Sequence, residues 1–301
     1  MSADSLMQDR QMVPEQKVGV PEQQIAVPEQ RVVTHKRAWL RVLAVGLLLF
    51  VLGIGILVVT GNTTLFPTVV LLGNFTVPAA YVVFFYERRN LSRLSLQATA
   101  LSFFWGGVLA AFVASLLEPL FVQQITAVTV FVVAMIEEAA KILGVLAIAR
   151  RHQHSSAMDG IILGAAAGMG FAALESIGYT FNVFWASGGN LTSSIGVTLV
   201  RGLLASFGHG VWTAILAGTL FRESGPGRFR LKAQVVAAYV TVVILHGLWD
   251  LQPLLVSGLS LPGTVTFVGE AAVGAIGLAI LWRRWRQARR LQEVEGVSGG
   301  F

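Results

Sequence analysis

Eight long apolar segments set the strongest limit on how this chain can fold. They cover residues 39–60, 66–86, 98–117, 125–149, 159–186, 195–221, 233–256 and 262–282. A helix needs about 20 mostly apolar residues to cross the hydrocarbon core of a bilayer, and each segment is long enough. Hydrophobic residues make up 54% of the chain and charged residues only 13%, which excludes an ordinary soluble domain. We therefore predict an all-α fold, a polytopic transmembrane bundle of about eight helices.

The basic residues predict the orientation of this bundle. Of the 22 lysines and arginines, all except Lys141 and Arg201 lie in the terminal regions, in alternate connections or in the first turn of a helix. Because cytoplasmic loops collect basic residues, we predict a multi-pass protein of the plasma membrane with both termini cytoplasmic. The net charge of +6 then reflects topology, and no nucleic-acid partner is expected. The chain has no cysteine, which excludes disulfides and thiolate catalysis.

Three regions follow from this pattern. Residues 1–36 contain the sequence Val-Pro-Glu-Gln three times, at a spacing of seven residues. A proline in every copy breaks a helical heptad, so we predict a disordered cytoplasmic tail. Residues 37–285 are predicted to form the transmembrane helical domain, with a motif-bearing core at 125–256. Residues 286–301 are predicted to form a basic cytoplasmic C-terminal extension.

Seven ionisable side chains lie inside four of the apolar segments, where lipid should exclude them. They are Glu137, Glu138 and Lys141 in the fourth segment, Glu175 in the fifth, His209 in the sixth, and His246 and Asp250 in the seventh. A charge near the bilayer centre costs about 3 kcal/mol, so such residues usually face a polar interior. From the helix rise of about 1.5 Å per residue, most of them lie roughly 18–24 Å from the cytoplasmic ends of their helices. They are therefore predicted to share one layer and one site.

Spacing within each helix predicts which of these side chains interact. Lys141 follows Glu137 by four residues and Glu138 by three, so one ammonium reaches both carboxylates. Because one ammonium cannot fully neutralise two carboxylates, the other is a candidate general base. His246 and Asp250 are also four residues apart, which suits a carboxylate that orients an imidazole.

Glycines are predicted to shape the fifth and sixth helices. Four glycines within residues 160–170 would let the fifth helix approach its neighbours closely and would bring Glu175 near them. Gly208 and Gly210 flank His209. The missing side chains on both sides are predicted to leave this imidazole accessible.

Four short motifs occur in order on four consecutive predicted helices. They are Glu137-Glu138-Ala139-Ala140-Lys141, Phe171-Ala172-Ala173-Leu174-Glu175, the single His209, and His246-Gly247-Leu248-Trp249-Asp250. Over residues 125–256 they resemble the PrsW family of intramembrane proteases, relatives of the CAAX protease and bacteriocin-processing group. That family carries EExxK, FxxxE and two later histidines, the last in HxxxD. Lys141 and Glu175 favour the PrsW branch, because the type II prenyl endopeptidases more typically have arginine and FxxxH there.

The resemblance implies an intramembrane endopeptidase that cleaves a membrane-protein substrate. In the better-known members that substrate is a single-span anti-sigma factor, so a regulator of this kind is the candidate here. Peptide hydrolysis needs an activated water, a stabilised oxyanion and a proton donor for the leaving amine. Glu137 or Glu138 is predicted to activate the water as general base, and Lys141 to tune the partner carboxylate.

The remaining motif residues are predicted to assist the same reaction. His209 and His246 would stabilise the oxyanion or hold the water, and Glu175 would hold that water or act as the acid. Phe171 and Asp250 are supporting residues, Asp250 as the group that orients His246.

Metal dependence is the point on which the sequence leaves two alternatives. Two imidazoles and up to three carboxylates could bind Zn²⁺ and leave an open position. The candidate ligands are then Glu138, Glu175, His209 and His246. No HExxH motif is present to set the ligand geometry. We favour a glutamate-type reaction without a cofactor, with a zinc-dependent reaction as the alternative.

Two other classes of function also suit ionisable residues in a membrane. Intramembrane carboxylates and histidines build proton relays, so a proton-coupled transporter or channel is one alternative and a non-catalytic scaffold is another. The sequence lacks the internal symmetry typical of transporters.

Three other charged residues of the apolar segments lie outside the motifs. Glu270 lies at a depth similar to that of the motif residues and has no predicted role. Arg201 is predicted to reach the outer interface, and Glu118 is predicted to be a helix-end residue. The sequence predicts neither the individual substrate nor the oligomeric state.

Overall fold

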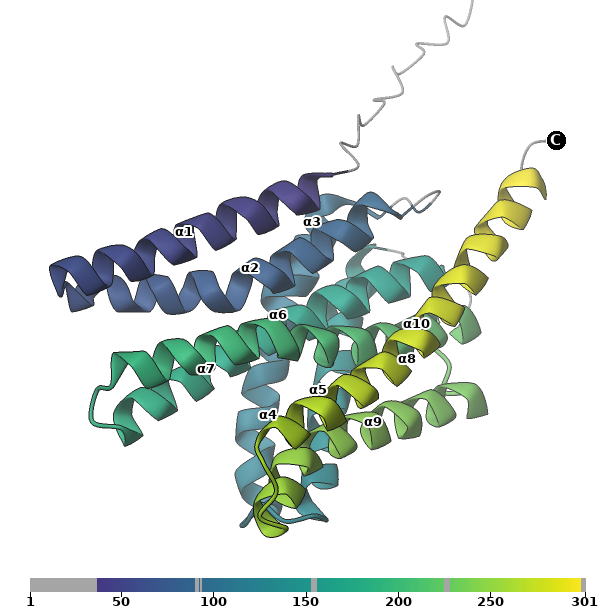
Figure 1. The fold of residues 1–301 in the computed structure, drawn as a ribbon. Coiled ribbons are helices and arrows are strands. Elements are labelled where there is room, and N and C mark those ends of the chain that lie inside the picture. The colour runs from purple at the N-terminus through teal and green to yellow at the C-terminus, as the bar shows by residue number, and fades with distance from the viewer. Residues whose placement is uncertain (1–36, 90–91, 93, 153–155, 225–227, 299–301) are drawn as a thin grey trace, which may run out of the picture. The chain divides into compact units, whose positions relative to one another are not determined.

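All regular secondary structure in the described part of the chain is helical. The computed structural model describes residues 37–89, 92, 94–152, 156–224 and 228–298. The α-helices are α1 (Ala38–Thr60), α2 (Phe66–Glu87), α3 (Leu96–Leu101), α4 (Gly107–Phe121), α5 (Thr129–His152), α6 (Ala157–Ala186), α7 (Leu191–Leu204), α8 (His209–Ser224), α9 (Ala233–Gly258) and α10 (Thr264–Ser298) (Figure 1). A π-helical turn at Ser102–Gly106 joins α3 to α4, and a 3₁₀ turn at Ala205–Phe207 follows α7.

Each of the eight predicted apolar segments is helical, which confirms the predicted fold class. Within the described residues, seven spans are long and apolar enough to cross a membrane, and the remaining predicted segment, the fourth, corresponds to α5. The tail predicted to be disordered, residues 1–36, lies outside the described residues. The cytoplasmic orientation and the domain boundaries stay predictions, and α10 continues as one helix through the boundary predicted after residue 285.

A row of glycines lets α8 approach the buried first half of α6. Every residue from Met158 to Ala173 is buried. A Cβ atom added to Gly160, Gly164 or Gly168 would collide with backbone carbonyl groups of α8. The close approach predicted for these glycines is therefore present, and α6 packs most extensively against α8.

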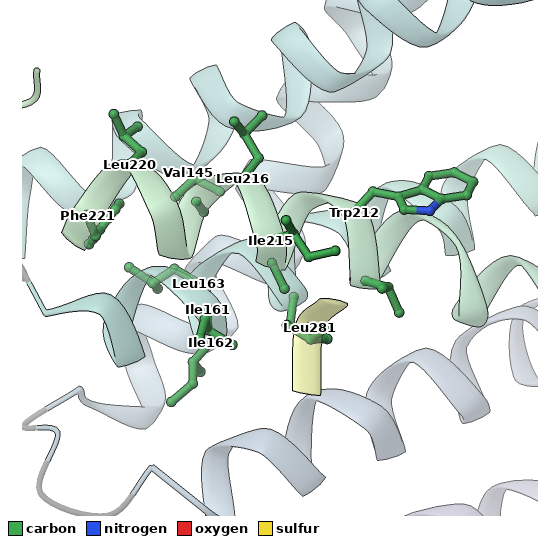
Figure 2. Packing of buried hydrophobic residues seen from close by; sticks show 14 of the residues in the cluster. Val145, Ile161, Ile162, Leu163, Trp212, Ile215, Leu216, Leu220, Phe221 and Leu281 are labelled. Atoms are coloured by element: carbon green, nitrogen blue, oxygen red, sulfur yellow. The ribbon is translucent and has the colours of Figure 1, made fainter. Parts of the chain in front are cut away.

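Apolar side chains from several helices surround this contact. Ile161, Ile162 and Leu163 of α6 pack near Val145 of α5 and Leu281 of α10. Figure 2 shows them beside the α8 side chains of Trp212, Ile215, Leu216, Leu220 and Phe221. Because lipid is as apolar as these side chains, close van der Waals packing holds such helices together in a membrane. This packing fixes α8, and therefore the position of its first residue.

Helices α4 and α5 approach the same core through glycine contacts. A Cβ atom on Gly107 of α4 would collide with the backbone of Gly170 in α6, and one on Gly144 of α5 would collide with the backbone of Gly106. Helix α9 packs against both α5 and α8. Helices α5, α6, α8 and α9 thus converge, and these are the helices that carry the predicted motifs.

Candidate active site

A buried ammonium group joins the two adjacent glutamates of α5. The Lys141 Nζ atom lies 2.9 Å from Glu137 Oε2 and 2.9 Å from Glu138 Oε1, as the spacing predicts. It also lies 2.7 Å from His209 Nδ1 and 4.1 Å from the centre of the Phe171 ring. Glu138 and Lys141 are fully buried, and Glu137 is 4% exposed. The ammonium therefore offsets one of the two buried negative charges, away from solvent and lipid.

The imidazole of His209 enters the site because the sixth apolar segment is broken. Helix α7 ends at Leu204, a 3₁₀ turn follows, and α8 begins at His209 itself. Its Nδ1 atom lies 3.8 Å from Glu137 Oε2, and its Nε2 atom lies 3.1 Å from Glu175 Oε2. The ring therefore bridges α5 and α6.

The predicted accessibility of His209 is wrong, because this residue is only 5% exposed. A Cβ atom on Gly208 would lie against Trp212, and one on Gly210 would collide with Met169. The two glycines make room for neighbouring side chains, so they permit close packing around the imidazole.

The second imidazole, His246 on α9, contacts three carboxylates. Its Nδ1 atom lies 3.1 Å from Glu138 Oε1, and its Nε2 atom lies 3.6 Å from Glu137 Oε2 and 3.3 Å from Asp250 Oδ2. The His246 ring is perpendicular to the His209 ring, with centroids 5.0 Å apart. Asp250 is the most open of these groups, with 32% of its side chain exposed. The structure thus brings together every residue that the sequence proposed for the site.

One atom from each of Glu137, His209 and His246 lies within 4.8 Å of the other two, which makes this group a candidate metal site. Ligand atoms bound to zinc at about 2.0–2.2 Å in a tetrahedron are roughly 3.3–3.6 Å apart. The measured distances from Glu137 Oε2 to the two imidazole nitrogens are 3.8 and 3.6 Å. Small side-chain movements would therefore bring these donors into coordination geometry.

The opposite nitrogen of each imidazole contacts a carboxylate, Glu175 for His209 and Glu138 for His246. Metal-binding histidines usually donate their second N–H to such a partner, which fixes the tautomer and the ring orientation. The donor set therefore fits a divalent ion. The sequence proposed Glu138 and Glu175 as ligands, whereas the structure places Glu137 among the candidate donors and those two carboxylates behind the imidazoles.

Lys141 sets a condition on such an ion. The His209 Nδ1 atom cannot bind a metal and accept a hydrogen bond from the Lys141 ammonium at the same time. An ion at this group would require Lys141 to release His209 while keeping its contacts with Glu137 and Glu138. Lys141 and the ion would then share the negative charge of the two carboxylates.

Arg201 is a site residue that the sequence reasoning missed. Its Nη2 atom lies 2.9 Å from Glu175 Oε2, and its guanidinium carbon lies 3.8 Å from the centre of the Tyr179 ring. The sequence predicted only that Arg201 reaches the outer interface, and it gave this residue no partner in the site. The sequence did contain a signal for this role, because Arg201 and Lys141 are the two basic residues placed deep in the apolar segments.

Two residues that follow His209 on α8 were also missed. The Trp212 ring stacks on the His246 imidazole, with centroids 4.5 Å apart and planes 23° apart. The Thr213 hydroxyl donates a hydrogen bond to Glu138 Oε2 at 3.4 Å. Both residues are buried, and they lie three and four positions after His209, a spacing that places them on its face of the helix.

Two further glutamates lie close enough to the site for its charges to act on them. Glu270 of α10 is 9% exposed and lies within electrostatic range of Arg201 and Asp250. Glu118 of α4 is half-buried and lies within range of Glu175 and Asp250. Glu118 is therefore close to the site, although the sequence placed it only at a helix end.

Comparison with known proteins supports the sequence resemblance. The profile of a family described as PrsW family intramembrane metalloprotease matches residues 95–291, more than half of the chain. No curated protein and no solved structure matches. The matched region contains every helix that contributes to the site, and its description as a metalloprotease does not support the preference for a metal-free reaction. The chain belongs to the PrsW family and is a multi-pass intramembrane protease.

Proposed function

We propose that this protease hydrolyses a peptide bond of a single-span membrane protein at the group formed by Glu137, His209 and His246, and that this group holds a zinc-type ion. One observation supports the proposal above all. Each imidazole has one ring nitrogen beside Glu137 and the other on a separate carboxylate. When bound, such an ion activates a water molecule and polarises the scissile carbonyl.

The carboxylates behind the imidazoles set the tautomers that this role requires. Glu138 accepts the Nδ1–H of His246, which leaves the Nε2 lone pair directed at the side of Glu137. The Glu175 Oε2 atom lies 3.1 Å from His209 Nε2, which favours a proton on that nitrogen and leaves the Nδ1 lone pair free for an acceptor role. The chain therefore presents two neutral imidazoles and one carboxylate to the same point.

Asp250 is the carboxylate best placed to exchange protons with a water or a leaving amine. Its Oδ2 atom lies 3.3 Å from His246 Nε2, and about a third of its side chain is exposed. Glu138, in contrast, is fully buried and engaged by Lys141, His246 and Thr213. In the metal-free alternative Glu137 would take this role as general base.

The test begins with the natural substrate. Membrane proteomes of cells that carry the wild type or an inactive Glu137→Gln variant are compared for new protein termini. We expect a single-span regulator, of the anti-sigma-factor kind, to accumulate uncut only with the variant. If no membrane protein differs between the two, peptide hydrolysis at this site is wrong.

Metal dependence is tested on the purified full-length protein with that substrate. We expect about one zinc per chain by elemental mass spectrometry, loss of cleavage after exhaustive chelation, and recovery on adding zinc. A His246→Asn variant should retain less metal than the wild type. Full activity in protein that contains no metal would instead establish the glutamate-type reaction.

We also propose that both termini face the cytoplasm, since the basic residues lie at the termini and in alternate connections. Family membership favours a protease over the transporter, channel and scaffold alternatives.

Arg201 is expected to act on the reaction through Glu175. An Arg201→Gln variant leaves the Glu175 carboxylate without its guanidinium partner and loosens the support of His209. Loss of such a supporting partner typically lowers activity about 10-fold or more, and we expect kcat to fall while KM changes little. Arg201→Lys should recover part of the loss.

Arg222→Gln is the matched control, because Arg222 pairs with Glu223 at 2.7 Å in the same span. Equal losses in the two glutamine variants would contradict this role.

A further inference from the structure

A groove between α2 and α10 forms a cavity of about 610 Å³ that shares no residue with the active site. Its walls include Tyr81 and Arg88 from α2, and Trp282, Arg286 and Arg289 from α10. The two helices meet there through the edge-to-face contact of Phe85 with Trp285, whose ring centroids are 5.0 Å apart. The volume lies within the range of about 300–1,000 Å³ that small-molecule sites occupy.

The three arginines of this groove carry uncompensated positive charge. Arg88 donates a hydrogen bond from Nη1 to the Phe84 carbonyl oxygen at 3.1 Å, and Arg286 lies 4.7 Å from the centre of the Trp282 ring. Within the described residues, none of the three arginines forms an ion pair with a carboxylate. Planar guanidinium groups of this kind match the oxygens of a phosphate group.

Apart from the arginines, the groove is lined by aromatic and aliphatic side chains. They are Tyr81, Phe84 and Phe85 of α2, and Leu278, Leu281, Trp282 and Trp285 of α10. Such a wall suits a hydrocarbon chain.

We propose that this groove binds an anionic phospholipid, with the phosphate at the three arginines and one acyl chain along the aromatic wall. The groove lies at the end of α2 and α10 that the basic residues predict to be cytoplasmic, where anionic lipids are concentrated. The lipid would join α2, which precedes the family match at residues 95–291, to α10 inside it.

The chain offers a matched control for this site. Arg283 and Arg290 are exposed on the same helix but do not line the groove. A double variant R286Q/R289Q and a double variant R283Q/R290Q therefore remove the same charge from the same helix. If the arginines only attract an anionic surface in general, the two double variants should weaken lipid binding equally. If the groove is a specific site, only R286Q/R289Q should weaken it.

Native mass spectrometry of the full-length protein in neutral detergent measures binding directly. The probes are dioleoylphosphatidylglycerol, dioleoylphosphatidylcholine and inorganic phosphate. We expect the wild type to retain phosphatidylglycerol in preference to phosphatidylcholine and not to retain inorganic phosphate. R286Q/R289Q should lower the phosphatidylglycerol affinity about 30-fold, and R283Q/R290Q should change it less than about threefold.

Equal retention of both lipids by the wild type, or equal losses in the two arginine variants, would overturn the proposal. Binding of inorganic phosphate as tight as that of the lipid would assign the groove to a free anion instead.

Discussion

A Glu137→Gln variant is expected to lose peptide-bond cleavage by a factor of about 10³ or more while remaining folded. The Glu137 Oε2 atom lies between both imidazoles and 2.9 Å from the Lys141 ammonium. Glutamine has nearly the same size, so packing is retained. The variant removes the negative charge that a metal ion requires, or the base that a metal-free reaction requires.

The measurement is the cleavage rate of the natural substrate by purified protein, together with retention of uncut substrate on the immobilised variant. Glu270→Gln is the matched control, because Glu270 is also buried but is not a member of the candidate donor group. It should change the rate less than about threefold, on the scale expected when no reacting group is touched. Wild-type cleavage by Glu137→Gln, combined with an inactive Glu138→Gln, would transfer the essential role to Glu138.

A Lys141→Met variant is expected to be the most destabilised single substitution in the site. It leaves Glu137 and Glu138 adjacent and buried without the cation that contacts both. Removing one partner of a buried ion pair typically costs about 3–5 kcal/mol, because the remaining charge is uncompensated. Thermal unfolding of the purified protein, followed by circular dichroism, should show a large fall in the midpoint.

Two further variants identify the cause of that fall. The double variant Glu138→Gln/Lys141→Met removes one negative charge along with the positive one and should recover part of the stability. Lys232→Met removes a lysine whose side chain is 46% exposed, and it should change stability by less than about 0.5 kcal/mol. An unchanged midpoint for Lys141→Met would mean that the carboxyl groups are neutralised in another way.

The sequence predicts contacts within helices better than contacts between them. Lys141 with the two glutamates, and His246 with Asp250, follow from spacings of three and four residues, which depend only on helix geometry. The length of each apolar segment is equally local, so all eight apolar segments could be predicted as helical. Which carboxylate faces which imidazole depends on how each helix is rotated and packed against the others. The spacing of residues within one helix does not determine this.

Two misses have specific physical causes. The break before His209 is invisible to hydropathy, because the residues of the 3₁₀ turn, Ala205–Phe207, are as small or apolar as the helices around them. The pairing of Arg201 with Glu175 could have been found by counting. Glu175 lies 11 residues before the end of α6 at Ala186, and Arg201 lies 10 residues after the start of α7 at Leu191. In an antiparallel hairpin with a short loop, these positions face each other.

The break before His209 also has an electrostatic consequence. In a continuous helix, the partial charges of each peptide group beside the site would be cancelled by those of the next group along the axis. Because α8 starts at His209, the positive end of its dipole, equivalent to about half a positive charge, begins at the residue whose imidazole contacts Glu137 and Glu175. In a low-dielectric membrane interior this backbone field lowers the energy of collecting several carboxylates in one place. The polypeptide backbone therefore adds positive charge to the site, alongside the side chains of Lys141 and Arg201.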